Sequence, residues 1–144
     1  MENLPQIKFF IVEEDIFCAN VYNQYLLNMN YNDITHYANG TDCINNLHQN
    51  PDIIFLYHHM EDINGFEVLK KIKQYNSNIY VIMISRQENT KTVVNALRLG
   101  AFDYIIKGND SYEKIELIIN KIIAIKEQLK ASHPGFIKRL LSIF

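Results

Sequence analysis

The sequence predicts a doubly wound α/β domain built on a five-stranded parallel sheet. Five short apolar runs alternate strictly with five longer segments of helical period, which is typical of parallel strands joined by crossover helices. Most runs are apolar at consecutive positions, so we expect helices on both faces of the sheet. A chain of 144 residues with 48% hydrophobic and 21% charged residues has the size and composition of one folded domain.

The apolar runs mark the predicted strands, and the second run is the weakest of them. The strands are expected at residues 8–12, 34–38, 53–57, 80–84 and 104–106.

The segments between the strands carry helix signals. Thr41 or Asp42 is placed to cap the second helix, and Gly100 is a natural stop for the fourth. Asp110 or Ser111 can cap the fifth helix. The helices are expected at residues 16–29, 41–47, 66–72, 89–99 and from about 111 to 131.

The fifth helix carries a heptad-like seam with a neighbouring apolar stripe. One stripe can cover the sheet while the other meets a partner chain; the alternative is one broad stripe that faces the core. The seam consists of Ile115, Ile118, Ile122, Ile125 and Leu129, and Ile119 and Ile123 form the neighbouring stripe.

Residues 6–131 are predicted to form the domain and residues 132–144 a short amphipathic tail after the break at Pro134-Gly135. We expect the tail to pack on its own domain or to help form a homodimer; contact with a membrane surface is the weaker alternative.

Charge and cysteine content exclude several functional classes. A formal net charge of −2 provides no overall positive field for nucleic acid. Cys18 and Cys43 are too few for a disulfide framework and lack zinc-site spacing, so we interpret them as reduced core thiols. No apolar run is long enough to span a membrane, and acidic residues replace the cleavage region of a signal peptide, which predicts a cytoplasmic protein.

Polar residues follow four of the predicted strands. The carboxyl ends of parallel strands meet at one edge of the sheet, where α/β proteins bind ligands. Three adjacent acids at residues 13–15, Ser85 and Lys107 therefore predict a site for a divalent cation and a phosphoryl group. The third strand ends at Tyr57, followed by His58 and His59.

These segments resemble the receiver domains of bacterial two-component response regulators. The resemblance implies a flavodoxin-like fold with strand order 2-1-3-4-5. The matching segments, in the family's order, are residues 10–15, 51–57, 60–67, 81–85 and 100–107.

The resemblance also implies roles for individual residues. Glu13 and Glu14 match the acidic pair that holds Mg²⁺ in the family, with longer side chains than the usual aspartates. Ser85 matches the hydroxyl residue that contacts the phosphoryl group, and Lys107 matches the lysine after the fifth strand. Tyr104 matches the aromatic switch position.

The position of the phosphoacceptor aspartate is occupied by Tyr57. A neutral phenol is a poor nucleophile and a poor Mg²⁺ ligand, whereas phosphoryl transfer in this family needs an ionised carboxylate beside a metal. We therefore expect a signalling module that is not an enzyme, needs no cofactor, binds Mg²⁺ at most weakly through Glu13 and Glu14, and acts through protein contacts. Its expected partners are a sensor histidine kinase or a downstream signalling protein, with no nucleic acid.

Two other functions stay open. Asp62, in the loop after the third strand, could serve as a displaced phosphoacceptor with phosphatase-like turnover. A small flavin or nucleotide ligand is the other alternative, although the first strand is not followed by a glycine-rich phosphate loop.

Tyr57 itself could be a plug in the pocket or a modification target. Of His58 and His59, we expect one side chain to be half-buried and the other exposed, and we do not expect them to be metal ligands.

Overall fold

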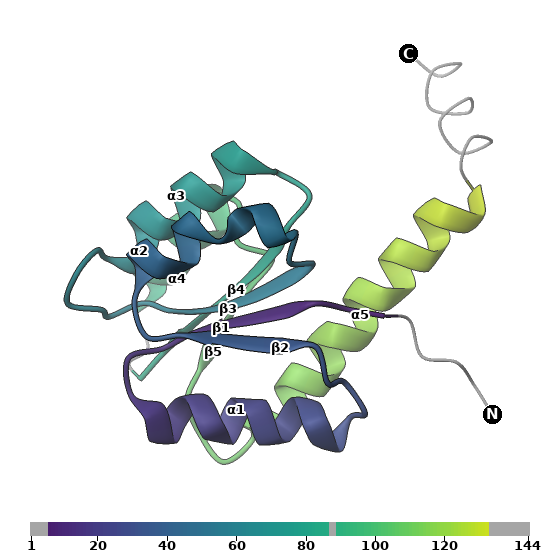
Figure 1. Ribbon diagram of the computed structural model, residues 1–144, viewed down its shortest axis with the longest axis horizontal. Coiled ribbons are helices and arrows are strands. Elements are labelled where there is room, and N and C mark those ends of the chain that lie inside the picture. The colour runs from purple at the N-terminus through teal and green to yellow at the C-terminus, as the bar shows by residue number, and fades with distance from the viewer. Residues whose placement is uncertain (1–5, 87–88, 133–144) are drawn as a thin grey trace. The chain divides into compact units, whose positions relative to one another are not determined.

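Five parallel strands form a sheet in the computed structural model, which describes residues 6–86 and 89–132 (Figure 1). Their order across the sheet is β2-β1-β3-β4-β5, which confirms the predicted fold class. The strands are β1 (Phe9–Val12), β2 (Ile34–Tyr37), β3 (Ile53–Tyr57), β4 (Tyr80–Ser85) and β5 (Asp103–Ile106).

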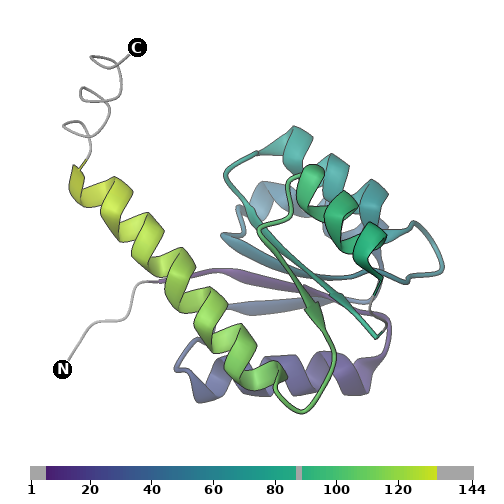
Figure 2. The same ribbon diagram turned by 180° about the vertical axis from the view of Figure 1, so that it is seen from behind.

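A helix follows each strand. In Figures 1 and 2, α2, α3 and α4 lie on one face of the sheet and α1 lies on the other. The chain divides into two compact units, residues 1–112, which contain the sheet, and residues 113–144, which contain most of α5. The helices are α1 (Ile16–Asn28), α2 (Gly40–Asn45), α3 (Gly65–Tyr75), α4 (Thr90–Arg98) and α5 (Ser111–Ser132), with a short 3-10 turn, η1 (Leu47–Gln49), after α2.

Alternate residues of each central strand enter the two apolar layers. Ile54 of β3 packs into the buried cluster that contains Val68 and Leu69 of α3. Its neighbour Phe55 belongs to the other layer, where Tyr22 of α1 stacks on the Phe55 ring with centroids 6.4 Å apart. Because both faces are covered, consecutive strand residues are buried, and this explains the continuous apolar runs in the sequence.

Short polar side chains begin the helices. The prediction that Thr41 or Asp42 caps α2 was wrong, because the Asn39 side-chain oxygen accepts a hydrogen bond from the Asp42 N–H at 2.8 Å and the helix begins at Gly40. Asparagine also caps α3 and α4, through Asn64 and Asn89. Gly100 has φ +106° just after α4 and ends that helix as predicted.

The seam of α5 changes from buried to exposed along the helix. Ile115, Ile118 and Ile122 are buried, whereas Ile125 and Leu129 are 39% and 46% exposed. The predicted tail lies outside the described residues, except for the backbone of Ser132 at the end of α5. None of the helices in residues 6–86 and 89–132 has the length and apolar character needed to cross a membrane.

The parallel arrangement brings several strand ends to one edge of the sheet. Glu13 follows β1, Tyr57 ends β3, Ser85 ends β4 and Lys107 follows β5. The Lys107 N–H donates to the Ser85 carbonyl oxygen at 2.8 Å and fixes the ends of β4 and β5 together. This edge is where the polar site predicted from the sequence forms.

Candidate functional site

An ion pair stands at the carboxyl edge of the sheet. The Lys107 Nζ lies 3.1 Å from Oε1 of Glu13, and the two residues are 94 positions apart in the chain. The same Nζ lies 4.2 Å from the centroid of the Tyr57 ring, within the range of a cation–π contact. Lys107 therefore bridges the ends of β1, β3 and β5, and the structure brings together three of the residues predicted for the site.

The Glu13 carboxyl group is enclosed by the protein. Its side chain is 3% exposed, and its second oxygen, Oε2, has no hydrogen-bond partner among the described residues. Burial raises the pKa of Glu13 above its usual 4.5, although the ammonium group of Lys107 opposes that shift. A buried acceptor without a partner is unusual and indicates that this pocket can receive a hydrogen-bond donor.

Tyr57 fills the end of β3 with an uncharged ring. The residue is 8% exposed, and burial raises the pKa of its phenol above the ordinary value of 10.0 even though Lys107 acts in the opposite direction. The phenol is therefore protonated at neutral pH. This state makes it a weak nucleophile and a weak ligand for a hard cation.

Ser85 and Tyr104 lie on neighbouring strands. Ser85 is buried at the end of β4, next to the site. Tyr104 pairs with Met83 in the β4–β5 register and packs against the buried core cluster, and its hydroxyl oxygen is buried without a partner among the described residues. The ring of Tyr104 is thus turned toward the core.

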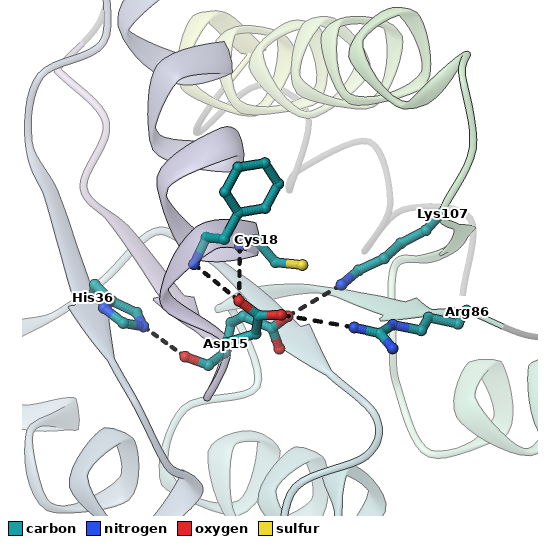
Figure 3. Close-up of polar contacts among 7 residues, drawn as sticks. Asp15, Cys18, His36, Arg86 and Lys107 are labelled. Atoms are coloured by element: carbon teal, nitrogen blue, oxygen red, sulfur yellow. Dashed lines mark hydrogen bonds and ion pairs between the residues drawn. The ribbon is translucent and has the colours of Figure 1, made fainter.

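Glu14 does not join Glu13 in the pocket. Its side chain is exposed, at the bend that follows β1. The backbone oxygen of Glu13 instead contacts Nε2 of His36 at 2.6 Å (Figure 3). Within the described part of the chain, no three His, Cys, Asp or Glu side chains stand close enough together to hold a metal ion.

The two histidines after β3 lie as expected from the sequence. His58 is half-buried and His59 is exposed. The His58 ring packs against Phe66 with centroids 4.6 Å apart, and burial lowers the pKa of His58. These contacts give the pair a packing role at the start of α3.

Asp62 is engaged away from the Glu13–Lys107 pair. Its carboxylate accepts hydrogen bonds from the Thr41 hydroxyl at 2.8 Å and the Thr41 N–H at 3.1 Å. It therefore ties its loop to the first turn of α2, an arrangement that disfavours a role as displaced phosphoacceptor.

Two residues near the site, Cys18 and Arg86, were misread or missed from the sequence. Cys18 was interpreted as a core thiol; this was wrong for Cys18, which is only partly buried in the first turn of α1, and right for Cys43, which is fully buried. Arg86 reaches across from the end of β4, and its guanidinium lies 3.7 Å from the Asp15 carboxylate (Figure 3). Asp15 also caps α1 by accepting from the N–H groups of Phe17 and Cys18. The position of Asp15 directly before the helix predicts this cap, and the structure confirms it; nothing in the local sequence indicates the Arg86 contact.

Residues 9–119 match the family model of the response regulator receiver domain. The chain belongs to this family. Receiver domains are signalling modules of two-component systems, and the strand order described above is theirs.

Curated relatives of this receiver domain are longer regulators. The chain is 30% identical over 128 residues to the luminescence regulatory protein LuxO of Vibrio campbellii, and the match covers 87% of the chain but 28% of that protein. It is 31% identical over 98 residues to the regulatory protein AtoC of Escherichia coli, covering 62% of the chain and 21% of that protein. The chain thus spans less than a third of the length of these relatives.

Solved receiver domains share the fold. The signal receiver domain of a LuxO repressor protein from Vibrio parahaemolyticus superposes with a TM-score of 0.80 at 23% identity, covering 90% of this chain and 98% of that one. The CheX–CheY–BeF3–Mg complex from Borrelia burgdorferi gives a TM-score of 0.75 at 26% identity, covering 81% of this chain and 89% of that one. That second structure contains Mg²⁺ and BeF3.

Proposed function

We propose that this receiver domain transmits a signal through protein contacts without phosphorylation of an aspartate at the end of β3. The observation that carries the proposal is Tyr57, which holds the last position of that strand and is buried beneath the Lys107 ammonium group. By resemblance to the family, this is the position of the phosphoacceptor. The domain would therefore act as a pseudo-receiver within a two-component pathway.

The contacts of Lys107 support the proposal. Its Nζ is engaged by the Glu13 carboxylate at 3.1 Å and lies over the Tyr57 ring. These internal partners offset the positive charge of Lys107, so an incoming anionic group would bind to it less favourably. Glu13, Tyr57 and Lys107 thus satisfy one another at this edge of the sheet, and we call the site that they form the closed pocket.

The acidic residues fit a Mg²⁺ ion poorly. Glu13 offers one free oxygen, Oε2, while Glu14 is exposed and Tyr57 supplies a neutral phenol. Magnesium prefers octahedral oxygen coordination with one or two protein carboxylates, and the Lys107 ammonium group beside Glu13 opposes a second cation. We therefore expect weak Mg²⁺ binding and no phosphoryl transfer that depends on a bound metal ion.

The test is treatment with acetyl phosphate and Mg²⁺ followed by intact-mass measurement. The wild-type chain is expected to gain no phosphate adduct, because no carboxylate replaces the Tyr57 phenol at the end of β3. Tyr57→Asp is the matched variant that restores the acid, and Tyr57→Phe controls for the loss of the hydroxyl. A base-labile, stoichiometric adduct on the wild-type chain that survives in Tyr57→Phe would contradict the proposal and would favour a displaced carboxylate such as Asp62.

The proposed partners are proteins, including a second copy of this chain. On α5, Ile125 and Leu129 continue the seam of Ile118 and Ile122, but they are exposed. Identical helices with apolar residues at alternating spacings of three and four pair through such seams. We therefore include a homodimer through α5 in the proposal, beside contacts with a sensor histidine kinase or a downstream signalling protein.

The proposed receiver spans residues 6–131, and its proposed setting is the bacterial cytoplasm. The two relatives named above are bacterial, which supports a bacterial pathway. Both cysteines are free thiols, which suits a reducing compartment.

A further inference from the structure

The Cys18 thiol lies beside the closed pocket rather than in the core. Cys18 is the third residue of α1, in the turn capped by Asp15, and its side chain is partly exposed. Figure 3 shows its sulfur on the side of the helix that faces Lys107 and Arg86. Free cysteines that react with oxidants are partly exposed and lie at helix N-termini or beside cations, and Cys18 meets each of these conditions.

Four charged groups surround this thiol. The thiol is near enough to Arg86, Lys107 and Glu13 to interact electrostatically with each of them, and Figure 3 shows its sulfur on the side of Lys107. The Asp15 carboxylate is already used, since it caps α1 and lies 3.7 Å from Arg86. Glu13 uses Oε1 for Lys107, which leaves the buried Oε2 as an acceptor without a partner among the described residues.

We propose that Cys18 is an oxidation site, where hydrogen peroxide converts the thiol to a sulfenic acid inside this pocket. The sulfur attacks one peroxide oxygen, an S–O bond forms and the O–O bond breaks. Sulfur is oxidised by two electrons and the peroxide is reduced. The departing hydroxide takes the thiol proton and leaves as water, so that one thiol and one peroxide give one sulfenic acid and one water.

The surrounding groups have separate parts in this step. The N–H groups of Arg86 and Lys107 can donate to the peroxide oxygens as negative charge develops on the leaving oxygen. Oε2 of Glu13 can accept from the S–OH group of the product, which supplies the donor that this buried oxygen lacks.

Cys43 provides an internal control on the opposite face of the sheet. It is fully buried in the core cluster, and burial raises its pKa to about 12. Its helix α2 and the α1 helix of Cys18 lie on opposite faces of the sheet, so the two thiols cannot approach to form a disulfide (Figure 1). We therefore expect cysteine oxidation in the folded chain to be confined to Cys18.

This inference rests on the proposed function in one respect, namely that oxidation would supply the covalent signal that the Tyr57 position does not. A sulfenic oxygen beside Lys107 would compete with Glu13 for that ammonium group. Oxidation of Cys18 would therefore alter the Glu13–Lys107 ion pair, at the edge of the sheet where phosphoryl groups act in receiver domains.

The experiment treats the folded full chain with hydrogen peroxide in the presence of dimedone, which traps sulfenic acids, and follows intact mass and peptide mass over time. We expect one adduct, located on Cys18, in the wild-type chain and in Cys43→Ser, and no adduct in Cys18→Ser. Arg86→Gln and Lys107→Met are expected to slow the reaction severalfold, and Lys107→Arg to restore most of the rate. Thermal unfolding followed by circular dichroism identifies which variants are folded before their rates are compared.

An adduct on Cys43, no adduct at all, or a Cys18 rate that is unchanged in both Arg86→Gln and Lys107→Met would overturn the inference. None of these readouts involves phosphate. Failure of the oxidation inference is therefore separate from failure of the proposed function, which acetyl phosphate tests.

Discussion

At the scale of single residues, Glu13 and Lys107 depend on each other. An ionised carboxylate that is removed from water is costly unless a charged or hydrogen-bonding partner accompanies it. Lys107 is that partner, at 3.1 Å, with its own side chain 18% exposed. The ion pair is therefore less a source of net stability than a condition for keeping Glu13 inside the protein.

Removing the charge of Lys107 alone should destabilise the fold, whereas removing the charges of both Lys107 and Glu13 should destabilise it much less. Lys107→Met is expected to lower the free energy of unfolding by about 2 to 4 kcal/mol, because Glu13 is left buried and unpaired. The double variant Glu13→Gln with Lys107→Met is expected to recover most of that loss. Urea unfolding of the four chains in this double-mutant cycle measures both values.

Lys107→Arg serves as the control, since it keeps the positive charge. Equal stabilities for Lys107→Met and the wild-type chain would show that Glu13 reaches water or another partner without Lys107, and would contradict the closed pocket.

The buried carboxyl group of Glu13 also predicts that the stability of the folded chain depends on pH. Burial raises the pKa of Glu13 above 4.5 in the folded state, so the folded chain binds this proton more tightly than the unfolded chain does. Its contribution to stability is thus greatest below the unfolded pKa and is lost as the pH rises through the folded pKa. Glu13→Gln, which cannot ionise, should gain stability relative to the wild-type chain as the pH increases from about 4 to about 7.

Unfolding free energies of the two chains at several pH values give this difference directly. Other groups, including Asp15 and Asp62, titrate in both chains and cancel in the comparison. A difference that shrinks with rising pH would mean that the Lys107 contact outweighs burial.

At the scale of elements, α5 offers a surface whose partner can be tested. Ile125 and Leu129 are exposed on the seam, while Leu117 is 57% exposed but lies outside it. Leu129→Lys is expected to convert an α5-linked dimer to monomer, whereas the matched variant Leu117→Lys should leave it intact. Sedimentation equilibrium of the three chains reports the association state. A wild-type monomer, or a dimer that both variants weaken equally, would contradict pairing through this seam.

The strands were easier to predict than the ends of the helices. Residues 53–57 were found because both faces of β3 are covered, so that every residue of the strand is apolar. The cap of α2 was misplaced because Asn39, Thr41 and Asp42 can all accept the required hydrogen bond. Only the start of the helix at Gly40, which depends on where the chain leaves β2, decides among them.

At the scale of the whole molecule, the fold explains which parts of the site could be predicted. Glu13, Tyr57 and Lys107 meet because parallel strands deliver their carboxyl ends to one edge, and this follows from strand order alone. The exposure of Glu14 and the contact between Arg86 and Asp15 depend on side-chain direction. Such directions are set by packing among segments far apart in the sequence, which local patterns do not contain.

The measurement that bears most directly on the closed pocket is binding of beryllofluoride with Mg²⁺, followed by fluorine NMR of the intact chain. The Glu13–Lys107 pair and the buried Tyr57 ring predict no bound fluoride signal for the wild-type chain at Mg²⁺ concentrations that saturate a functional receiver domain, and a signal in Tyr57→Asp. A bound beryllofluoride signal in the wild-type chain that requires Mg²⁺ would contradict the account, because it would show that the pocket still assembles a phosphoryl site.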